Sequence, residues 1–233
     1  IGGWSTSHIN MVHSQDGGKT WGRVTRLIAS PFLNISTLVK GHPFFYRDGS
    51  IGLPVYHELA GKFAELLRIE KSGKVREKVR MTYGREKIQP DIAIMNQRAM
   101  LAVLRDSSPA RKLTQMRSVD GGKTWTLPID TGLPNPSSAV SIAGDESGMV
   151  LAFNDTDQHR NPLSLAFSPD AGNNWHRLAD IENSPLREDN NKDEFSYPYI
   201  ILTRSGTYHL VYTWKRRKIA HVSFNKAWIR SKL

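Results

Sequence analysis

The chain has 233 residues, enough for one large all-β domain with its own core. It contains no cysteine, which excludes disulfides, thiolate chemistry and cysteine-ligated metals and fits cytoplasm and periplasm equally. The 32 Lys and Arg against 22 Asp and Glu give a formal net charge of +10, which attracts anionic partners. No nucleic-acid module is recognisable, and no apolar run approaches the roughly 18 to 20 residues of a membrane span. We therefore expect neither a nucleic-acid nor a membrane partner.

Short segments of alternating polar and apolar residues dominate the chain, and helical periodicity is nearly absent. Gly, Asp, Asn and Pro bound these segments, which predicts strands joined by hairpins. In chain order, strands are predicted at residues 9–13, 22–27, 43–46, 51–57, 63–69, 88–95, 100–105, 113–118, 140–143, 149–154, 163–168, 196–202, 208–214 and 219–222. The polar stretch 182–194 is predicted to be a rim loop, and the basic cluster 215–218 a solvated loop.

An octapeptide punctuates the predicted strands three times. It reads Ser-Gln-Asp-Gly-Gly-Lys-Thr-Trp at 14–21, Ser-Val-Asp-Gly-Gly-Lys-Thr-Trp at 118–125 and Ser-Pro-Asp-Ala-Gly-Asn-Asn-Trp at 168–175. The second and third copies start about fifty residues apart, and the first and second copies about twice as far apart. Such spacing is typical of a repeated supersecondary unit. The hairpin at 70–74 falls where a further copy is expected but lacks Asp and Trp, and 223–228 looks like a decayed copy. Asp and Gly serve turns, so these repeats are predicted to be scaffold.

The pattern Ser-x-Asp-x-Gly-x-Thr-Trp resembles the Asp-box, or bacterial neuraminidase repeat, of sialidase-like β-propellers. The resemblance implies a six-bladed parent with four-stranded antiparallel blades, whose closed ring hides the sheet edges. On this basis residues 1–233 form a single propeller domain with about four full blades and part of another. The chain begins without Met inside a strand-like segment and has no leader before it, so we expect N-terminal blade material to be missing.

Polar residues at the ends of inner strands are the candidates for a site, because these ends converge on the central channel of a propeller. Arg105 and Asn154 each end an apolar strand, Arg160 precedes the next strand, and Tyr197 opens another. From the residues alone, an arginine there also fits an exposed gatekeeper and a strand tyrosine fits half-buried packing.

The order of these residues also resembles bacterial sialidases, which carry a Glu, an Arg about fifteen residues later, a second Arg and then a Tyr. Here the order is Gln89, Arg105, Arg160 and Tyr197. The resemblance implies that the two arginines clamp the carboxylate of a sialic-acid-type sugar and that Tyr197 attacks its anomeric carbon in a retaining mechanism. Two segments that also look like the family, 133–138 and 212–217, contribute Asn135 and Arg216 as further substrate-binding candidates. Asn154, which stands one blade on from Arg105 at the equivalent strand end, is a third.

The chain departs from the family at three places. Gln89 stands where a glutamate activates the tyrosine, and an amide cannot take a proton. His8 is the residue nearest the position of the expected acid/base aspartate, and we assign it that role. Glu58 is the candidate for a replacement base. The first arginine of the clamp would lie upstream of Ile1.

Several functions remain open at this stage. A sialidase-like glycoside hydrolase is the leading hypothesis, followed by a non-catalytic propeller that binds an acidic glycan. A hydrolase or lyase for another acidic sugar and a protein-interaction scaffold with a basic rim are further alternatives. The histidines show no tight metal-ligand spacing, so no metal or cofactor is expected.

Overall fold

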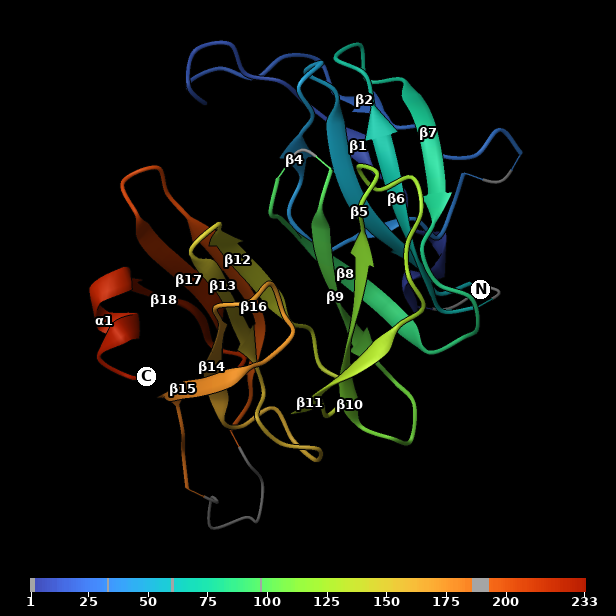
Figure 1. The fold of residues 1–233 in the computed structure, drawn as a ribbon. Coiled ribbons are helices and arrows are strands. Elements are labelled where there is room, and N and C mark those ends of the chain that lie inside the picture. Colours follow the sequence, from blue (N-terminus) through green and yellow to red (C-terminus); the bar gives the residue numbers. More distant parts are fainter. Residues whose placement is uncertain (1–2, 33, 60, 97, 186–192) are drawn as a thin grey trace.

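A series of antiparallel sheets surrounds a common centre. The structure is a computed structural model that describes residues 3–32, 34–59, 61–96, 98–185 and 193–233. Within each sheet consecutive strands are hydrogen-bonded neighbours, except that β3 and β4 both pair with β5, and Figure 1 shows the sheets standing beside one another as blades. The all-β propeller with antiparallel blades expected from the sequence is confirmed.

The blades follow one another along the chain. A 3-10 helix (Gly3–Thr6) precedes a ribbon of β1 (Asn10–Met11) and β2 (Thr25–Arg26). The next blade holds β3 (Leu38–Val39), β4 (Phe44–Phe45), β5 (Ile51–His57), β6 (Phe63–Ile69) and β7 (Val75–Arg80). Then come β8 (Lys87–Ile94), β9 (Met100–Asp106), β10 (Lys112–Ser118) and β11 (Ile129–Pro134). The following blade holds β12 (Ser141–Asp145), β13 (Gly148–Phe153), β14 (Leu163–Ser168) and β15 (His176–Glu182). The last blade holds β16 (Phe195–Leu202), β17 (Thr207–Trp214) and β18 (Lys218–Asn225), and α1 (Lys226–Arg230) follows it.

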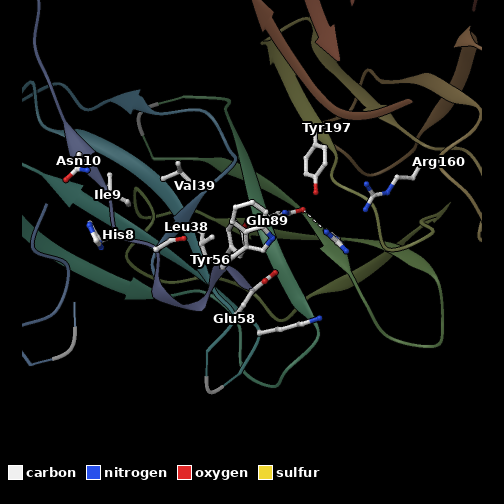
Figure 2. Close-up of a pocket in the computed structure, with 14 residues that line it drawn as sticks. His8, Ile9, Asn10, Leu38, Val39, Tyr56, Glu58, Gln89, Arg160 and Tyr197 are labelled. Carbon is white, nitrogen blue, oxygen red and sulfur yellow. Dashed lines mark hydrogen bonds between the residues drawn. The ribbon is translucent and has the colours of Figure 1, made fainter. Parts of the chain in front are cut away.

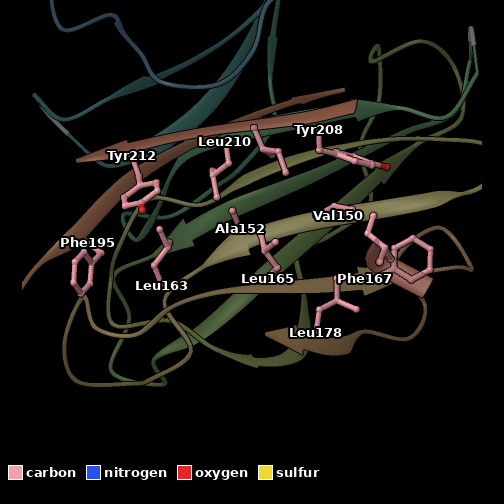
Figure 3. Packing of buried hydrophobic residues seen from close by; sticks show 12 residues of the cluster. Val150, Ala152, Leu163, Leu165, Phe167, Leu178, Phe195, Tyr208, Leu210 and Tyr212 are labelled. Atoms are coloured by element: carbon pink, nitrogen blue, oxygen red, sulfur yellow. The ribbon is translucent and has the colours of Figure 1, made fainter. Parts of the chain in front are cut away.

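Packing between neighbouring blades supplies the core. The middle strands β13 and β14 are buried at every residue, because each face of their sheet is covered. Figure 3 shows the apolar layer where this sheet meets β16–β18, with Val150, Leu165 and Leu210 at its centre. The outer strands β7 and β18 keep one exposed face and alternate in burial. The alternating sequence pattern therefore belongs to the rim of the blades, and continuous apolar runs belong to their middle.

The octapeptides form closed turns, as expected. Asp120 accepts hydrogen bonds from the backbone nitrogens of Lys123 (3.0 Å) and Thr124 (2.9 Å) and from the Ser118 hydroxyl (2.8 Å). Although burial raises the pKa of Asp120, these hydrogen bonds outweigh it and hold the pKa at about 2. Gly121 and Gly122 adopt φ of 77° and 87°, which suits glycine.

Two expectations about local structure need correction. The segment 223–228 is not a decayed octapeptide turn: β18 continues to Asn225, whose side chain accepts a hydrogen bond from the Trp228 nitrogen and caps α1. A strand at Ile129–Pro134 was not expected from the sequence. Most of the predicted rim loop, residues 186–192, lies outside the described residues. Among those that are described, no helix is long and apolar enough to cross a membrane.

A buried carboxylate ties the innermost strands together. One oxygen of Asp91 on β8 accepts from the backbone nitrogen and ring Nδ1 of His42 (2.8 and 2.6 Å), and the other accepts from the Ser141 hydroxyl (2.7 Å) on β12. The Ser141 oxygen accepts in turn from the backbone nitrogen of Ile200 (3.1 Å) on β16. The half-buried Lys40 donates to the backbone carbonyl of Val140, just before β12. These contacts satisfy donors on the unpaired edges of the inner strands, and we call Lys40, His42, Asp91 and Ser141 the axial cluster.

Charges within the axial cluster compensate one another. Burial raises the pKa of Asp91, but the hydrogen bond from His42 and the charge of Lys40 outweigh it and hold the pKa well below its usual range. Burial lowers the pKa of Lys40 to about 8, and the charge of Asp91 opposes that shift. Asp91 lies two residues after Gln89 on β8, and Ile200, which the cluster binds, lies three residues after Tyr197 on β16, so the cluster fixes how these strands stand to one another.

Candidate functional site

Residues with positive φ stand at the entrances of the inner strands in four successive blades. They are Ser36 (φ 60°), Gln89 (φ 53°), Ser137 (φ 58°) and Tyr197 (φ 53°). Residues other than glycine rarely adopt this conformation. At Gln89 and Tyr197 the strand register shifts, and the residue that follows is a proline, which has no backbone N–H to leave unpaired. Each bulge turns its side chain out of the ladder and toward the centre.

A pocket of about 860 Å³ lies where these entrances meet (Figure 2). Its lining comes from segments far apart in the sequence. The residues are Trp4, Ser7, His8, Ile9, Asn10, Leu38, Val39, Tyr56, Glu58, Lys62, Gln89, Arg105, Arg160 and Tyr197. The sequence-predicted residues Tyr197, Gln89, His8, Glu58, Arg105 and Arg160 are therefore brought together in one central pocket.

Arg105 carries a charge without a carboxylate partner among the described residues. Its guanidinium donates to the Ser137 hydroxyl (3.2 Å) and to the Gln89 amide oxygen (3.3 Å), both neutral. Burial lowers the pKa of Arg105, and the like charge of Arg160 lowers it further. A half-buried guanidinium that faces a second guanidinium is a site for an anion.

Arg160 has a partner of its own. It donates to Glu194 at 2.9 Å, and the same carboxylate is bound by Arg216 at 2.6 Å. Because Glu194 is shared with Arg216, it orients the guanidinium of Arg160 but neutralises only part of its charge. Its guanidinium also lies 5.4 Å from the centre of the Tyr197 ring.

Tyr197 is an exposed aromatic side chain of the pocket, as is Trp4. It is 46% exposed, and Figure 2 shows its hydroxyl pointing into the pocket, toward Gln89. Gln89 is buried, and its amide nitrogen donates to the Tyr56 hydroxyl at 3.2 Å. Both groups of the Gln89 amide are thus engaged by neighbouring side chains, its oxygen by Arg105 and its nitrogen by Tyr56.

A family model described as a BNR repeat-like domain matches residues 1–210. The chain belongs to this family. No curated protein matches the sequence. Among solved structures, the Hadza microbial sialidase Hz136 is similar, with a TM-score of 0.73 and 16% identity over 94% of this chain and 44% of that one. The NanB sialidase of Streptococcus pneumoniae gives a TM-score of 0.73 at 14% identity, over 95% of this chain and 36% of that one. The leech intramolecular trans-sialidase gives 0.70 at 13% identity, over 96% and 37%. This BNR chain thus spans less than half of the length of these three proteins and shares their fold.

Three predicted substrate-binding residues of the BNR chain do not line the pocket. Asn135 is fully buried, and its side chain donates to and accepts from the backbone of Ser138. Asn154 is also fully buried and donates to the carbonyls of Pro162 and Phe195. Neither amide has surface to offer a sugar, so both hold the main chain instead. Arg216 is exposed on the β17–β18 turn and acts on the pocket only through Glu194.

The sequence reasoning missed part of the lining. Tyr56 and Lys62 line the pocket from either end of the β5–β6 hairpin, and Trp4, Leu38 and Val39 add an apolar wall. Tyr56 had a weak signal, since it precedes Glu58 at the end of an apolar strand. Glu58 is the predicted base, and its main chain is held in place because its backbone nitrogen donates to the Ser36 hydroxyl at 3.1 Å. Across the described part of the chain, no group of three or more His, Cys, Asp or Glu side chains could hold a metal ion.

Proposed function

We propose that the pocket binds a sialic-acid-type sugar by its carboxylate and that the protein is a retaining glycoside hydrolase with Tyr197 as nucleophile. The unpaired charge of Arg105 facing Arg160 is the observation that carries this proposal. Similar folds occur in proteins named as sialidases, and the leech trans-sialidase structure holds 2,7-anhydro-Neu5Ac. A carboxylate next to the anomeric carbon is the anion that a pair of guanidiniums recognises best.

The carboxylate also explains the choice of nucleophile. A carboxylate nucleophile would be repelled by the bound carboxylate, whereas a phenol is neutral until it attacks. In the proposed reaction the Tyr197 oxygen bonds to the anomeric carbon while the bond to the leaving oxygen breaks. His8 protonates that oxygen, and water then releases the sugar with retained configuration. Glu58 is the residue we assign to remove the Tyr197 proton, because Gln89 cannot.

A non-catalytic binding protein is the second candidate. It is favoured by the engagement of both ends of the Gln89 amide, which leaves Tyr197 without the carboxylate that the resemblance would place there. Such a protein would use Arg105 and Arg160 in the same way but release its ligand unchanged.

Turnover of a fluorogenic α-sialoside between pH 4 and pH 8 tests the proposal, with Tyr197→Phe and Arg105→Ala beside the unaltered chain. Hydrolysis that Tyr197→Phe reduces by about a hundredfold or more supports the nucleophile, since general-base and nucleophile losses reach this size. Absence of turnover, with sialic acid binding that Arg105→Ala removes, moves the protein to the binding candidate. Full activity in both variants would sink the proposal.

A further inference from the structure

A directed chain of hydrogen bonds runs from Arg105 through Gln89 to Tyr56. An arginine can only donate, so the group of Gln89 that faces Arg105 is its amide oxygen. The amide nitrogen then faces Tyr56 and donates to its hydroxyl oxygen. Since that nitrogen accepts nothing, the hydroxyl hydrogen of Tyr56 cannot point back at Gln89. Arg105 sets the direction of all these hydrogen bonds, because its guanidinium can donate but cannot accept.

The free hydrogen of Tyr56 faces the pocket. The ring is buried, and its hydroxyl has no other hydrogen-bond partner among the described residues. Tyr56 lines the pocket together with Glu58, Arg105 and Tyr197, whose charges all act on it. Burial raises the pKa of Tyr56, so its phenol stays protonated near neutral pH. The result is a neutral donor aimed at whatever the arginines hold.

We propose that Tyr56 donates a hydrogen bond to an oxygen of the bound sugar and that Gln89 fixes this direction. The inference rests on the proposed function, because the sugar is the ligand proposed there. A glutamate at position 89 would accept from both Arg105 and Tyr56, which would turn the hydroxyl of Tyr56 away from the ligand. Gln89 therefore does more than replace a base by a group that cannot take a proton. Its amide directs the hydroxyl of Tyr56 so that this hydroxyl can donate to a neutral oxygen of the sugar.

Binding of N-acetylneuraminic acid to the full chain, measured by titration calorimetry, tests the inference with a double-mutant cycle. Tyr56→Phe removes the donor while the ring remains, and should weaken binding by about tenfold, the loss for one hydrogen bond from a buried group. Gln89→Glu should weaken binding too. Adding Tyr56→Phe to Gln89→Glu should cost nothing more, because the hydroxyl has already turned away.

The outcomes separate the inference from the proposed function. Binding that needs Arg105 but is unaffected by Tyr56→Phe overturns the inference and leaves the function standing. Equal losses from Tyr56→Phe in both backgrounds would show that Gln89 does not direct the hydroxyl. Binding that survives Arg105→Ala, or no binding at all, overturns the proposed function instead.

A measurement without ligand tests the direction of the bond in every case. The pKa of Tyr56 can be followed by NMR of chains labelled at the tyrosine ζ carbon, with Tyr56→Phe identifying the resonance. If Gln89 donates to Tyr56, Gln89→Leu removes a bond that stabilises the phenolate, and the pKa of Tyr56 should rise. An unchanged or lower value would mean that Gln89 does not donate and would overturn the inference.

Discussion

The axial cluster and the pocket are neighbours on the same inner strands, but their charges have opposite kinds of surroundings. Asp91 has the charge of Lys40 nearby and hydrogen bonds with the His42 ring and the Ser141 hydroxyl. Arg105 donates hydrogen bonds only to neutral groups and faces the like charge of Arg160, while the charge of Glu58 acts on it from beyond ion-pair distance. A buried charge that is neutralised and hydrogen-bonded by its neighbours stabilises the fold, whereas a charge without an opposite partner is available to bind a ligand. The two regions are therefore expected to respond oppositely to mutation.

Asp91→Asn should have the largest effect on stability. The change keeps the shape of the side chain but removes the negative charge beside the half-buried Lys40 and an acceptor of the buried network, and breaking such a pair costs up to about 3–5 kcal/mol. Urea unfolding followed by tryptophan fluorescence measures the loss. Asp120→Asn, on an outer turn, is the matched control and should cost less. A loss below about 1 kcal/mol, the level of a surface pair, would show that the axial cluster is not what holds the blades together.

The cost of Asp91→Asn should also depend on pH. The folded pKa of Asp91 lies below its unfolded value, so its contribution is complete above about pH 4 and is lost as the pH falls further. The difference in unfolding free energy between wild type and variant should accordingly shrink between about pH 5 and pH 2. Urea midpoints measured in parallel at several pH values check this. A difference that stays constant would mean that Asp91 is not the titrating group.

Ser141→Ala tests the link from β12 to β16 on its own. The variant keeps the other contacts of Asp91 but leaves the backbone nitrogen of Ile200 buried without an acceptor, which should cost about 1–3 kcal/mol. Ser147→Ala, on the exposed turn before β13, is the control and should cost less than about 0.5 kcal/mol. Equal effects in the two variants would argue that the link to β16 is weak.

Arg105→Met should change stability least while it removes binding. Relief of burial and of repulsion from Arg160 offsets two lost hydrogen bonds, so the free energy of unfolding should move by less than about 1 kcal/mol. Saturating sialic acid should raise the melting temperature of the wild type and leave that of Arg105→Met unchanged. A loss of stability as large as that of Asp91→Asn would erase the distinction between the two regions.

Local sequence signals predicted the blades better than the site. The strands Ile51–His57, Phe63–Ile69 and Leu163–Ser168 have the predicted bounds, because turn residues flank each of them. The strand Ile129–Pro134 was missed, since its Asp, Thr and Gly favour a turn and only the pairing with β10 makes it a strand.

Residues of the site were predictable where their order along the chain resembled a family, as with Arg105 and Tyr197. The roles assigned to Asn135 and Asn154 were not supported, because burial of an amide depends on loops from the next blade. The axial cluster had no sequence signal of its own, and Tyr56 had only a weak one. These residues make their contacts between separate blades, and a local sequence pattern does not show how the blades pack together.

The positive-φ residue at the entrance of each inner strand makes the pocket modular. Gln89 and Tyr197 leave their backbone ladders and line the pocket, whereas Ser36 and Ser137 precede their strands and hold Glu58 and Arg105 of the lining by hydrogen bonds. A single substitution in a blade can therefore change the chemistry of the pocket while the arrangement of the blades stays the same. A propeller built in this way can exchange a reaction for a binding preference through single codons, and glutamine at position 89 is the kind of change that such a layout makes available.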